Sequence, residues 1–595
     1  MKAKEKIAAL QALMKKEGID GYLIPSSDPH MSEYLPDHYA ARSWFSGFNG
    51  SAGTLAVTSE KAALWADGRY FIQAEHQLEG SGIELMKIGE PGIPTVEKWL
   101  ADELPEKGTM GIDGIITSTA FAEELKKTFS EKEISLKNAD LIAPIWTEER
   151  PAAPATKAWI LDAAYAGKTP SEKLATLRES LKEEGVNAYL ATKLESSAWL
   201  LNLRADDILF TPFALCFTLV LPDSATVFIN KDRVPADVQE YLEKEGFAIA
   251  HYEETAASLR SIKTPVTFII EKTSLSYALY QAMEENANIM VKEGKEPIVY
   301  LKGVKSETEI KNLKIAHRKD GVAMVRFAID LEGRMARKET VTECDVDAMM
   351  RHYRLEQEAS LGESFGTIAA YGPNAAMMHY HPTPENCATL KPEGFLLVDC
   401  GGHYMEGTTD ITRTYALGEP TEEEKDYFTL VLRSHIDMAK VVFKEKMPGI
   451  ALDLAAREPF WERGLDYRCG TGHGVGFVGT VHEGPQALNG RCQVPFVPGM
   501  TVTDEPGIYE TDKIGIRIEN ELLCKEAMET EYGKFYCFEP ITYCPIDRKA
   551  IDPKKLSPAE LSWLNQYHDT VYETLSPYLT DSENEWLKKA CAPIA

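Results

Sequence analysis

The sequence contains no Cys-x-x-Cys pair, although it has ten cysteines in 595 residues. Scattered cysteines in a chain of this length are typical of reduced thiols in a cytosolic protein. No apolar run is long enough to span a bilayer, and residues 1–18 read as a charged amphipathic helix without the apolar core of a signal peptide. These absences predict a cytoplasmic protein with no membrane partner.

Positive charge is also scarce. Lys and Arg number 64 against 92 Asp and Glu, which gives a net charge of -28. This excess of negative charge disfavours nucleic acid and anionic membranes as partners. The apolar content of 44% and charged content of 26% are ordinary for a globular protein. The length predicts several domains, each with its own core.

Two stretches in the N-terminal half are similar to each other. Residues 7–23 and 174–190 each predict an amphipathic helix, a short break and a buried strand. Each stretch is followed by two apolar runs that predict a hairpin. We therefore expect two related α/β domains in tandem, at residues 1–150 and 157–300, joined by a linker rich in Pro and Ala.

The remaining residues, 304–595, predict a third domain of α+β type. Its first helix begins with a capping box formed by Ser306 and Glu309, and its C-terminal helix begins with another formed by Ser557 and Glu560. Between these helices, predicted strands alternate with helices. This region has the size of one enzyme core.

Four acidic residues and a histidine form a constellation in this third region. Facing carboxylates repel unless they are protonated or held by cations, and two divalent ions would cancel four negative charges. We expect the first two acids to face each other across a hairpin centred on Tyr404 and Met405, and the last two about a turn near Asp512. Oxygen-rich ligation with one imidazole favours Mn²⁺, with Zn²⁺ and Co²⁺ as alternatives. The five residues are Asp399, Asp410, His473, Glu505 and Glu519.

Taken singly, each of these acids would more often be a solvated residue on the outer face of a strand. Asp399 and Glu505, however, both close apolar stretches, where lone acids are seldom tolerated. The constellation as a whole therefore favours a metal site.

The motifs that hold these residues resemble the dinuclear centre of the pita-bread metallopeptidases. They span residues 399–410, 472–474, 504–507 and 516–519, and the whole chain resembles the long, three-domain form of the aminopeptidase P (Xaa-Pro aminopeptidase) family. The resemblance implies two creatinase-like α/β domains followed by a pita-bread catalytic domain, two divalent ions bound by the five residues, and a homodimer. It also implies hydrolysis of the N-terminal Xaa-Pro bond of peptides with proline in second position, through a hydroxide that bridges the ions.

The resemblance also implies roles for individual residues. Glu505 would act as general base as well as ligand. His379 and His482 would contact the substrate, move protons and stabilise the oxyanion. Arg517 is identified from its position instead: it lies two residues before Glu519, so it would share that strand face and could hold a ligand carboxylate in place, and we include it in the substrate-binding set. Cys469 stands where the family often has a further histidine, so that histidine's role is not carried over.

Several alternatives stay open. Prolidase has the same core and acts on dipeptides, but the large N-terminal half favours the aminopeptidase. A pita-bread peptide-binding module without catalysis is disfavoured by the presence of all five ligands. Residues 474–479 satisfy G-x-G-x-x-G and residues 362–366 satisfy G-x-S-x-G. A dinucleotide site and a serine hydrolase are weaker alternatives, because neither motif has the expected order of strand, turn and helix.

Overall fold

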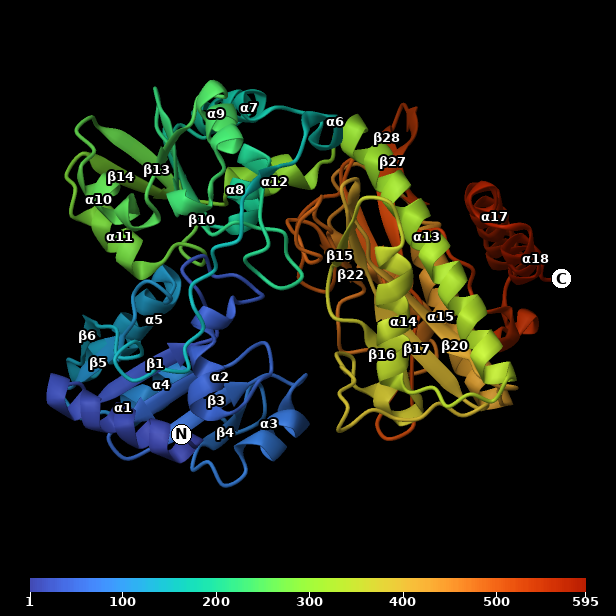
Figure 1. Cartoon of the computed structure of the whole chain (residues 1–595), viewed down its shortest axis with the longest axis horizontal. Coiled ribbons are helices and arrows are strands. Elements are labelled where there is room, and N and C mark those ends of the chain that lie inside the picture. Colours follow the sequence, from blue (N-terminus) through green and yellow to red (C-terminus); the bar gives the residue numbers. More distant parts are fainter. The chain divides into compact units, whose positions relative to one another are not determined.

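The computed structural model describes residues 1–595, except for the side chain of Ile72. The chain folds into two compact units, each with its own core. The N-terminal unit comprises Met1–Ile160 and Thr169–Ile298, and the C-terminal unit comprises Leu161–Lys168 and Val299–Ala595 (Figure 1).

The N-terminal unit contains two six-stranded sheets with the same strand arrangement, ordered β4-β3-β2-β1-β5-β6 and β12-β11-β10-β8-β13-β14. The first sheet consists of β1 Gly21–Pro25, β2 Thr54–Thr58, β3 Ala62–Ala66, β4 Glu84–Lys87, β5 Thr109–Ile112 and β6 Ser135–Asn138. The second consists of β8 Ala188–Ala191, β10 Cys216–Val220, β11 Ala225–Ile229, β12 Ala248–Ala250, β13 Val266–Ile270 and β14 Ile289–Glu293. The short strands β7 Trp159–Ile160 and β9 Leu203–Arg204 pair with each other.

The helices of this unit flank the two sheets. They are α1 Ala3–Glu17, α2 Ala41–Ser46, α3 Phe71–Leu78, α4 Val96–Glu103, α5 Thr119–Phe129, α7 Pro170–Glu183, α8 Leu194–Leu201, α9 Ala236–Lys244, α10 Thr255–Arg260 and α11 Tyr277–Glu284. Helix α12 Pro297–Gly303 begins in this unit and continues into the C-terminal unit. Helix α1 ends at Gly18, whose φ of 66° lies in the left-handed region that glycine adopts without strain. The two predicted hairpins are β2–β3 and β10–β11. The prediction of two repeated α/β folds is confirmed.

The C-terminal unit combines helices with several smaller sheets. Its helices are α6 Ala163–Ala166, α13 Glu307–Ala336, α14 Glu343–Leu355, α15 Glu422–Ala439, α16 Gly449–Trp461, α17 Pro558–Leu575 and α18 Asp581–Ala590. Its strands are β15 Ser360–Glu363, β16 Ile368–Tyr371, β17 Phe395–Cys400, β18 Gly402–Tyr404, β19 Gly407–Thr408, β20 Ile411–Ala416, β21 Val442–Lys444, β22 Gly472–His473, β23 Ala487–Leu488, β24 Thr501–Asp504, β25 Gly507–Glu510, β26 Ile514–Arg517, β27 Asn520–Thr530 and β28 Gly533–Pro540.

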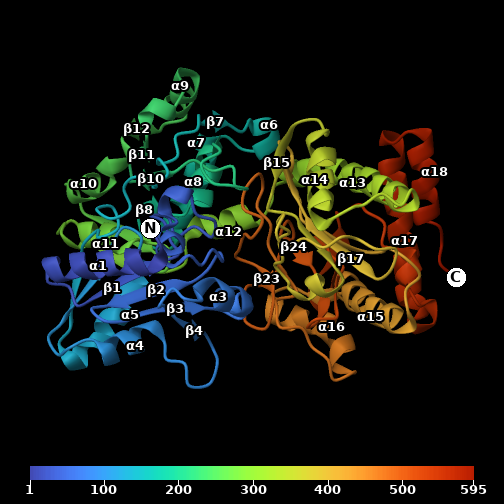
Figure 2. The same ribbon diagram turned by 60° about the horizontal axis from the view of Figure 1, so that its bottom comes forward.

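Helices cover both faces of these strands. Figure 2 shows α13 and α14 on one side, α15 and α16 on the other, and α17 and α18 at the end. The core joins Val325 of α13, Phe428 of α15, Ile516 of β26 and Leu564 of α17. Both predicted capping boxes are present, at the starts of α13 and α17. Among the described residues, no helix is long and apolar enough to cross a membrane.

Candidate metal centre

The first pair of acids lies where β17 approaches β20. Asp399 pairs with Thr412, and the same register continues to the tip, where Tyr404 pairs with Gly407. Asp410, two residues before Thr412, therefore lies diagonally across from Asp399 on the same face. The prediction that the two acids are direct cross-strand partners is wrong, although they do share a face.

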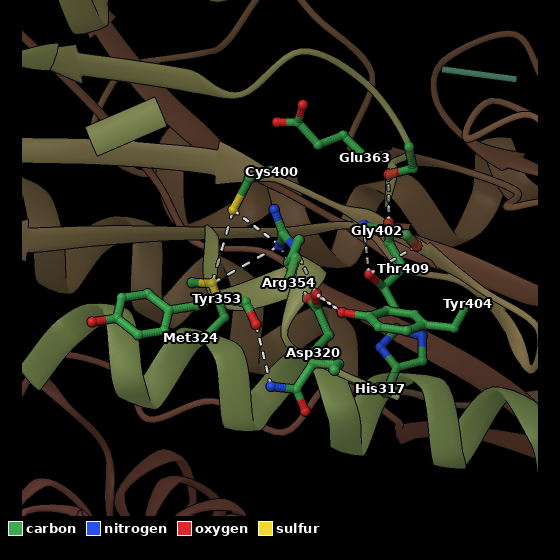
Figure 3. Close-up of polar contacts among 12 residues, drawn as sticks. His317, Asp320, Met324, Tyr353, Arg354, Glu363, Cys400, Gly402, Tyr404 and Thr409 are labelled. Carbon is green, nitrogen blue, oxygen red and sulfur yellow. Dashed lines mark hydrogen bonds and ion pairs between the residues drawn. The ribbon is translucent and has the colours of Figure 1, made fainter. Parts of the chain in front are cut away.

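A buried tyrosine explains the shifted register. Tyr404, predicted at the hairpin tip, is buried, and its hydroxyl donates to Oδ1 of Asp320 at 2.9 Å. Nε of Arg354 donates to the same oxygen at 2.7 Å. Figure 3 shows Asp320 on helix α13 facing both side chains. Because Tyr404 is held inside by this cluster, the turn falls on Met405 and Glu406 instead.

The second pair of acids meets its prediction. β24 pairs with β27, and β25 pairs with β26, in one continuous register. Glu505 and Glu519 lie opposite each other in the gap between these two strand pairs. The connecting turn contains Asp512, whose φ of 58° is left-handed, as the predicted turn near this residue requires.

The two acidic pairs and the histidine converge in the C-terminal unit. Ligand atoms of Asp410, His473 and Glu519 all lie within 4.8 Å of one another. Nε2 of His473 is 3.4 Å from Oδ2 of Asp410 and 3.4 Å from Oε1 of Glu505. The carboxylate of Asp399 lies close enough to raise the pKa of both Asp410 and Glu505. The side chains of His473 and Glu505 each remain 21% exposed, so the centre is not fully closed to solvent.

The carboxylates of this centre are crowded. Loss of hydration, reinforced by repulsion from neighbouring acids, raises the pKa of Asp410 and Glu519 well above their ordinary values. The same loss of hydration, with repulsion from Asp399, raises the pKa of Glu505 to about 7. Oδ1 of Asp399 and Oδ1 of Asp410 are buried and have no hydrogen-bond partner. Carboxylate oxygens in this state, beside an imidazole, form a donor set that fits hard or borderline divalent cations.

The imidazole of His473 is held in its neutral form, which is the form that can bind a metal ion. Its burial and the neighbouring His482 hold its pKa well below the ordinary value. Nδ1 lies 3.0 Å from the carbonyl oxygen of Gly474, which fixes the proton on Nδ1 and leaves the lone pair of Nε2 directed at the carboxylates. The ring of His482 stands perpendicular to that of His473, with centroids 4.2 Å apart.

The remaining predicted residues surround the same centre. Arg517 donates through Nη2 to Oδ2 of Asp399 at 2.5 Å, so it holds one of the four carboxylates of the centre. His379 is near enough to lower the pKa of His473. Burial, with repulsion from the neighbouring Glu505, raises the pKa of Cys469 to about 12. The thiol is therefore neutral at physiological pH and does not replace an imidazole as a proton carrier.

Two threonines that hold the carboxylates of Glu519 and Glu505 were not singled out from the sequence. Oγ1 of Thr412 donates to Oε2 of Glu519 at 2.6 Å. Oγ1 of Thr503 donates to Oε1 of Glu505 at 3.2 Å. Thr503 lies two residues before Glu505, and Thr412 lies two residues after Asp410. The two-residue period of a strand places Thr503 on the face of Glu505, and this spacing would have identified it as a partner of that acid. The same spacing places Thr412 on the face of Asp410, but its partner Glu519 is brought to it only by the tertiary fold.

The segments that match the dinucleotide-binding and serine-hydrolase motifs do not have the structures of those sites. No helix begins within residues 474–479, so the glycines there do not open a dinucleotide-binding helix. Ser364 is buried, and its hydroxyl donates to the carbonyl oxygen of Thr409 at 2.9 Å. It follows a strand and precedes another, which is not the geometry of an exposed serine nucleophile.

Known protein families match almost the whole chain. The profile of metallopeptidase family M24 matches residues 311–526, and that of the C-terminal region of this peptidase family matches residues 534–594. Creatinase/prolidase N-terminal domains match residues 6–143 and 149–309. The predicted combination of two creatinase-like domains with a pita-bread catalytic domain is therefore confirmed.

Individual relatives are similar over nearly the whole of this chain. An "Aminopeptidase P2" of Arabidopsis thaliana is 38% identical, over 99% of this chain and 88% of the relative. A "Probable Xaa-Pro aminopeptidase P" of Sordaria macrospora is 37% identical, over 99% of both chains. The crystal structure of an X-prolyl aminopeptidase from Caenorhabditis elegans, described as a cytosolic enzyme with a di-nuclear active site, superimposes with a TM-score of 0.94 at 32% identity, over 100% of both chains.

Proposed function

This chain belongs to the aminopeptidase P group of metallopeptidase family M24, and from that premise we infer that it is a metal-dependent aminopeptidase acting on N-terminal Xaa-Pro bonds. The observation that carries the mechanism is the pair of buried carboxylate oxygens without partners, on Asp399 and Asp410, beside the facing pair of Glu505 and Glu519. We propose that these four acids and His473 hold two divalent ions, with Mn²⁺ preferred over Zn²⁺ and Co²⁺.

When bound, two such ions supply a hydroxide nucleophile near neutral pH and polarise the scissile carbonyl. In this proposal Glu505 accepts the proton of the attacking water and passes it to the leaving proline nitrogen. His379 and His482 are exposed and lie close to His473, and in this proposal they orient the peptide and stabilise the oxyanion. Arg517 fixes the carboxylate of Asp399. Proline after the scissile bond lacks an amide N–H, so this substrate requires a site that does not depend on that donor.

The assay that tests this function compares substrates of two lengths. Purified protein with added Mn²⁺ is incubated with Xaa-Pro dipeptides and with Xaa-Pro-Yaa peptides, before and after chelation. We expect release of the first residue from the longer peptides and loss of activity on chelation. Cleavage of dipeptides alone would instead identify a prolidase. No cleavage of either, with two metal ions verified per chain, would identify a peptide-binding module.

We further propose a cytoplasmic location, a homodimer, and three domains at residues 1–150, 157–300 and 304–595. The two six-stranded sheets and the ranges matched by the family profiles support this division. The dimer rests on family membership. Light scattering at micromolar concentration should give twice the chain mass of 66.3 kDa, and the chain mass itself would refute the dimer.

A further inference from the structure

A buried charge cluster lies beside the loop that carries His482. Oε2 of Glu483 is 2.9 Å from Nζ of Lys302, and Oε1 is 3.4 Å from Nζ of Lys305. The three side chains are 6%, 3% and 1% exposed, respectively. Nζ of Lys305 also donates to the carbonyl oxygen of Lys302 at 3.1 Å, which ties the two lysines together.

The cluster pairs two buried lysines with one buried glutamate, so it holds one positive charge more than a balanced ion pair. The two lysines lower the pKa of Glu483 in spite of its burial, so the carboxylate is ionised. A buried ion pair seldom stabilises a fold more than apolar residues of similar size, because each charge loses its hydration. We therefore attribute to this cluster a role in fixing the position of the Glu483 side chain.

Glu483 is connected to the metal centre by its backbone. Its N–H donates to the carbonyl oxygen of Gly474 at 2.7 Å. Nδ1 of His473 lies 3.0 Å from the same oxygen. The residue before Glu483 is His482, whose ring stands against the ring of His473. Anchoring the Glu483 side chain therefore also fixes the backbone of the preceding residue, His482, beside the centre.

We propose that Lys302 and Lys305 are positioning residues that, through Glu483, hold His482 in its working place beside His473. This inference rests on the proposed function, in which His482 contacts the peptide. Lys302 and Lys305 lie at the junction between α12 and α13, and neither belongs to an active-site motif.

The test variant is Lys302→Met. It leaves Lys305 and Glu483 as a balanced one-to-one pair, so the fold should persist, whereas Glu483→Gln would leave two buried ammonium groups unpaired. With one anchor lost, His482 should lose its alignment. A displacement of about 1 Å in a catalytic constellation costs up to about 10²-fold in rate. We expect kcat for an Xaa-Pro-Yaa peptide to fall at least about tenfold at saturating Mn²⁺, with two metal ions still bound.

A double-mutant cycle with His482→Ala separates positioning from a general structural effect. If Lys302 acts through His482, Lys302→Met should change kcat by less than about twofold in the His482→Ala background. Lys302→Arg, which keeps the charge, should recover part of the rate. Lys314→Met is the matched control, because Lys314 pairs with Glu539 at 2.7 Å in the same unit, and it should leave kcat unchanged.

The possible outcomes are distinct. Parent-like kcat in Lys302→Met, or the same fold-loss with and without His482, would overturn the positioning role while the aminopeptidase activity stands. Parent-like kcat in His482→Ala would also overturn it, because it removes the residue through which the lysines act. If Lys302→Met does not fold, Lys305→Met provides the same test. Absence of activity in the parent protein with both metals bound would refute the proposed function itself.

Discussion

Arg517 is the residue on which the geometry of Asp399 depends. Nη2 donates to Asp399 at 2.5 Å, Nη1 donates to the hydroxyl of Tyr509 at 2.6 Å, and Nε donates to Oγ1 of Thr412 at 3.2 Å. Thr412 in turn donates to Glu519. One planar guanidinium therefore orients a carboxylate from each acidic pair, which a flexible ammonium cannot reproduce.

Arg517→Lys keeps the positive charge but replaces the planar guanidinium, whose N–H donors have fixed directions, with a flexible ammonium group. We expect its affinity for Mn²⁺ to fall by about 10–100-fold, the usual cost of losing a partner that orients a metal ligand. Titration calorimetry on the chelated protein measures this. Arg351→Lys is the control, because Arg351 is half-exposed and pairs with Glu363 rather than with an acid of the centre, so this variant should bind Mn²⁺ as the parent does. Equal affinity in Arg517→Lys would show that Asp399 does not need the guanidinium.

At the scale of single residues, the sequence predicted the roles of side chains that lie within a few positions of a motif. Arg517 was identifiable because it precedes Glu519 by two residues on one strand face. Lys302 and Lys305 were not identifiable, because their partner Glu483 lies far along the chain and only the tertiary fold brings them together.

At the scale of elements, the close approach of β22 to β24 sets the distance between His473 and Glu505. A Cβ atom added to Gly472 would lie 1.7 Å from the carbonyl oxygen of Thr503. The strand that carries His473 can therefore approach β24 this closely only with glycine at position 472.

Gly472→Ala should force these strands apart and move His473 away from the acids. We expect lower metal occupancy, measured by metal analysis after gel filtration, and destabilisation by about 1–3 kcal/mol, as for other overpacked sites. Gly490→Ala is the control, because a Cβ atom there has no neighbour within 4 Å. Full occupancy and parent stability in Gly472→Ala would contradict this account of the strand packing.

Helix α17 places a histidine where it must stay neutral. His568 is buried, and Nε2 accepts a hydrogen bond from the N–H of Ile546 at 3.2 Å. Burial, with the nearby charges of Arg413 and Arg548, lowers the pKa of His568 to about 3. Its ordinary value is 6.5, so between these two pH values the unfolded chain takes up a proton that the folded chain does not.

The contribution of His568 to stability is therefore complete above pH 6.5 and is lost as the pH falls towards 3. For this single group the free energy of unfolding falls by about 1.4 kcal/mol per pH unit in that window. His568→Gln removes the titration, so its unfolding free energy, measured with urea, should decline less steeply with acidification. Parallel slopes for parent and variant would show that His568 is not kept neutral.

Elements were predicted well where the pattern is local. The hairpin that joins Glu505 to Glu519 has its turn at Asp512, where a left-handed residue is accommodated. The hairpin that joins Asp399 to Asp410 was misplaced, because the burial of Tyr404 depends on Asp320 of a distant helix. A strand residue held by tertiary contacts cannot be distinguished from a turn residue by local sequence alone.

At the scale of the whole molecule, all five proposed ligands belong to the C-terminal unit. The repeated sheets of the N-terminal unit were predictable from the internal sequence similarity. The assignment of Leu161–Lys168 to the C-terminal unit was not, because it depends on contacts such as those of Asn312, which donates to the carbonyl oxygens of Ala164 and Tyr165.

Metal binding should therefore stabilise one unit selectively. In scanning calorimetry of the full chain we expect two transitions, of which only one rises in temperature on addition of Mn²⁺. At a free concentration of 100 times Kd, the gain for one site is about 2.7 kcal/mol. Limited proteolysis during the scan identifies which unit has opened. A shift of the N-terminal transition alone would contradict the placement of the ligands.

The most direct test of the central claim is the rate of Glu505→Gln with its metal content known. The substitution preserves shape and one oxygen ligand, but it removes a negative charge and the proton acceptor. If Glu505 is both ligand and general base, hydrolysis of Xaa-Pro-Yaa peptides should fall by at least about 10²–10⁴-fold while two metal ions per chain remain bound. Hydrolysis at close to the parent rate, with both ions present, would contradict the account.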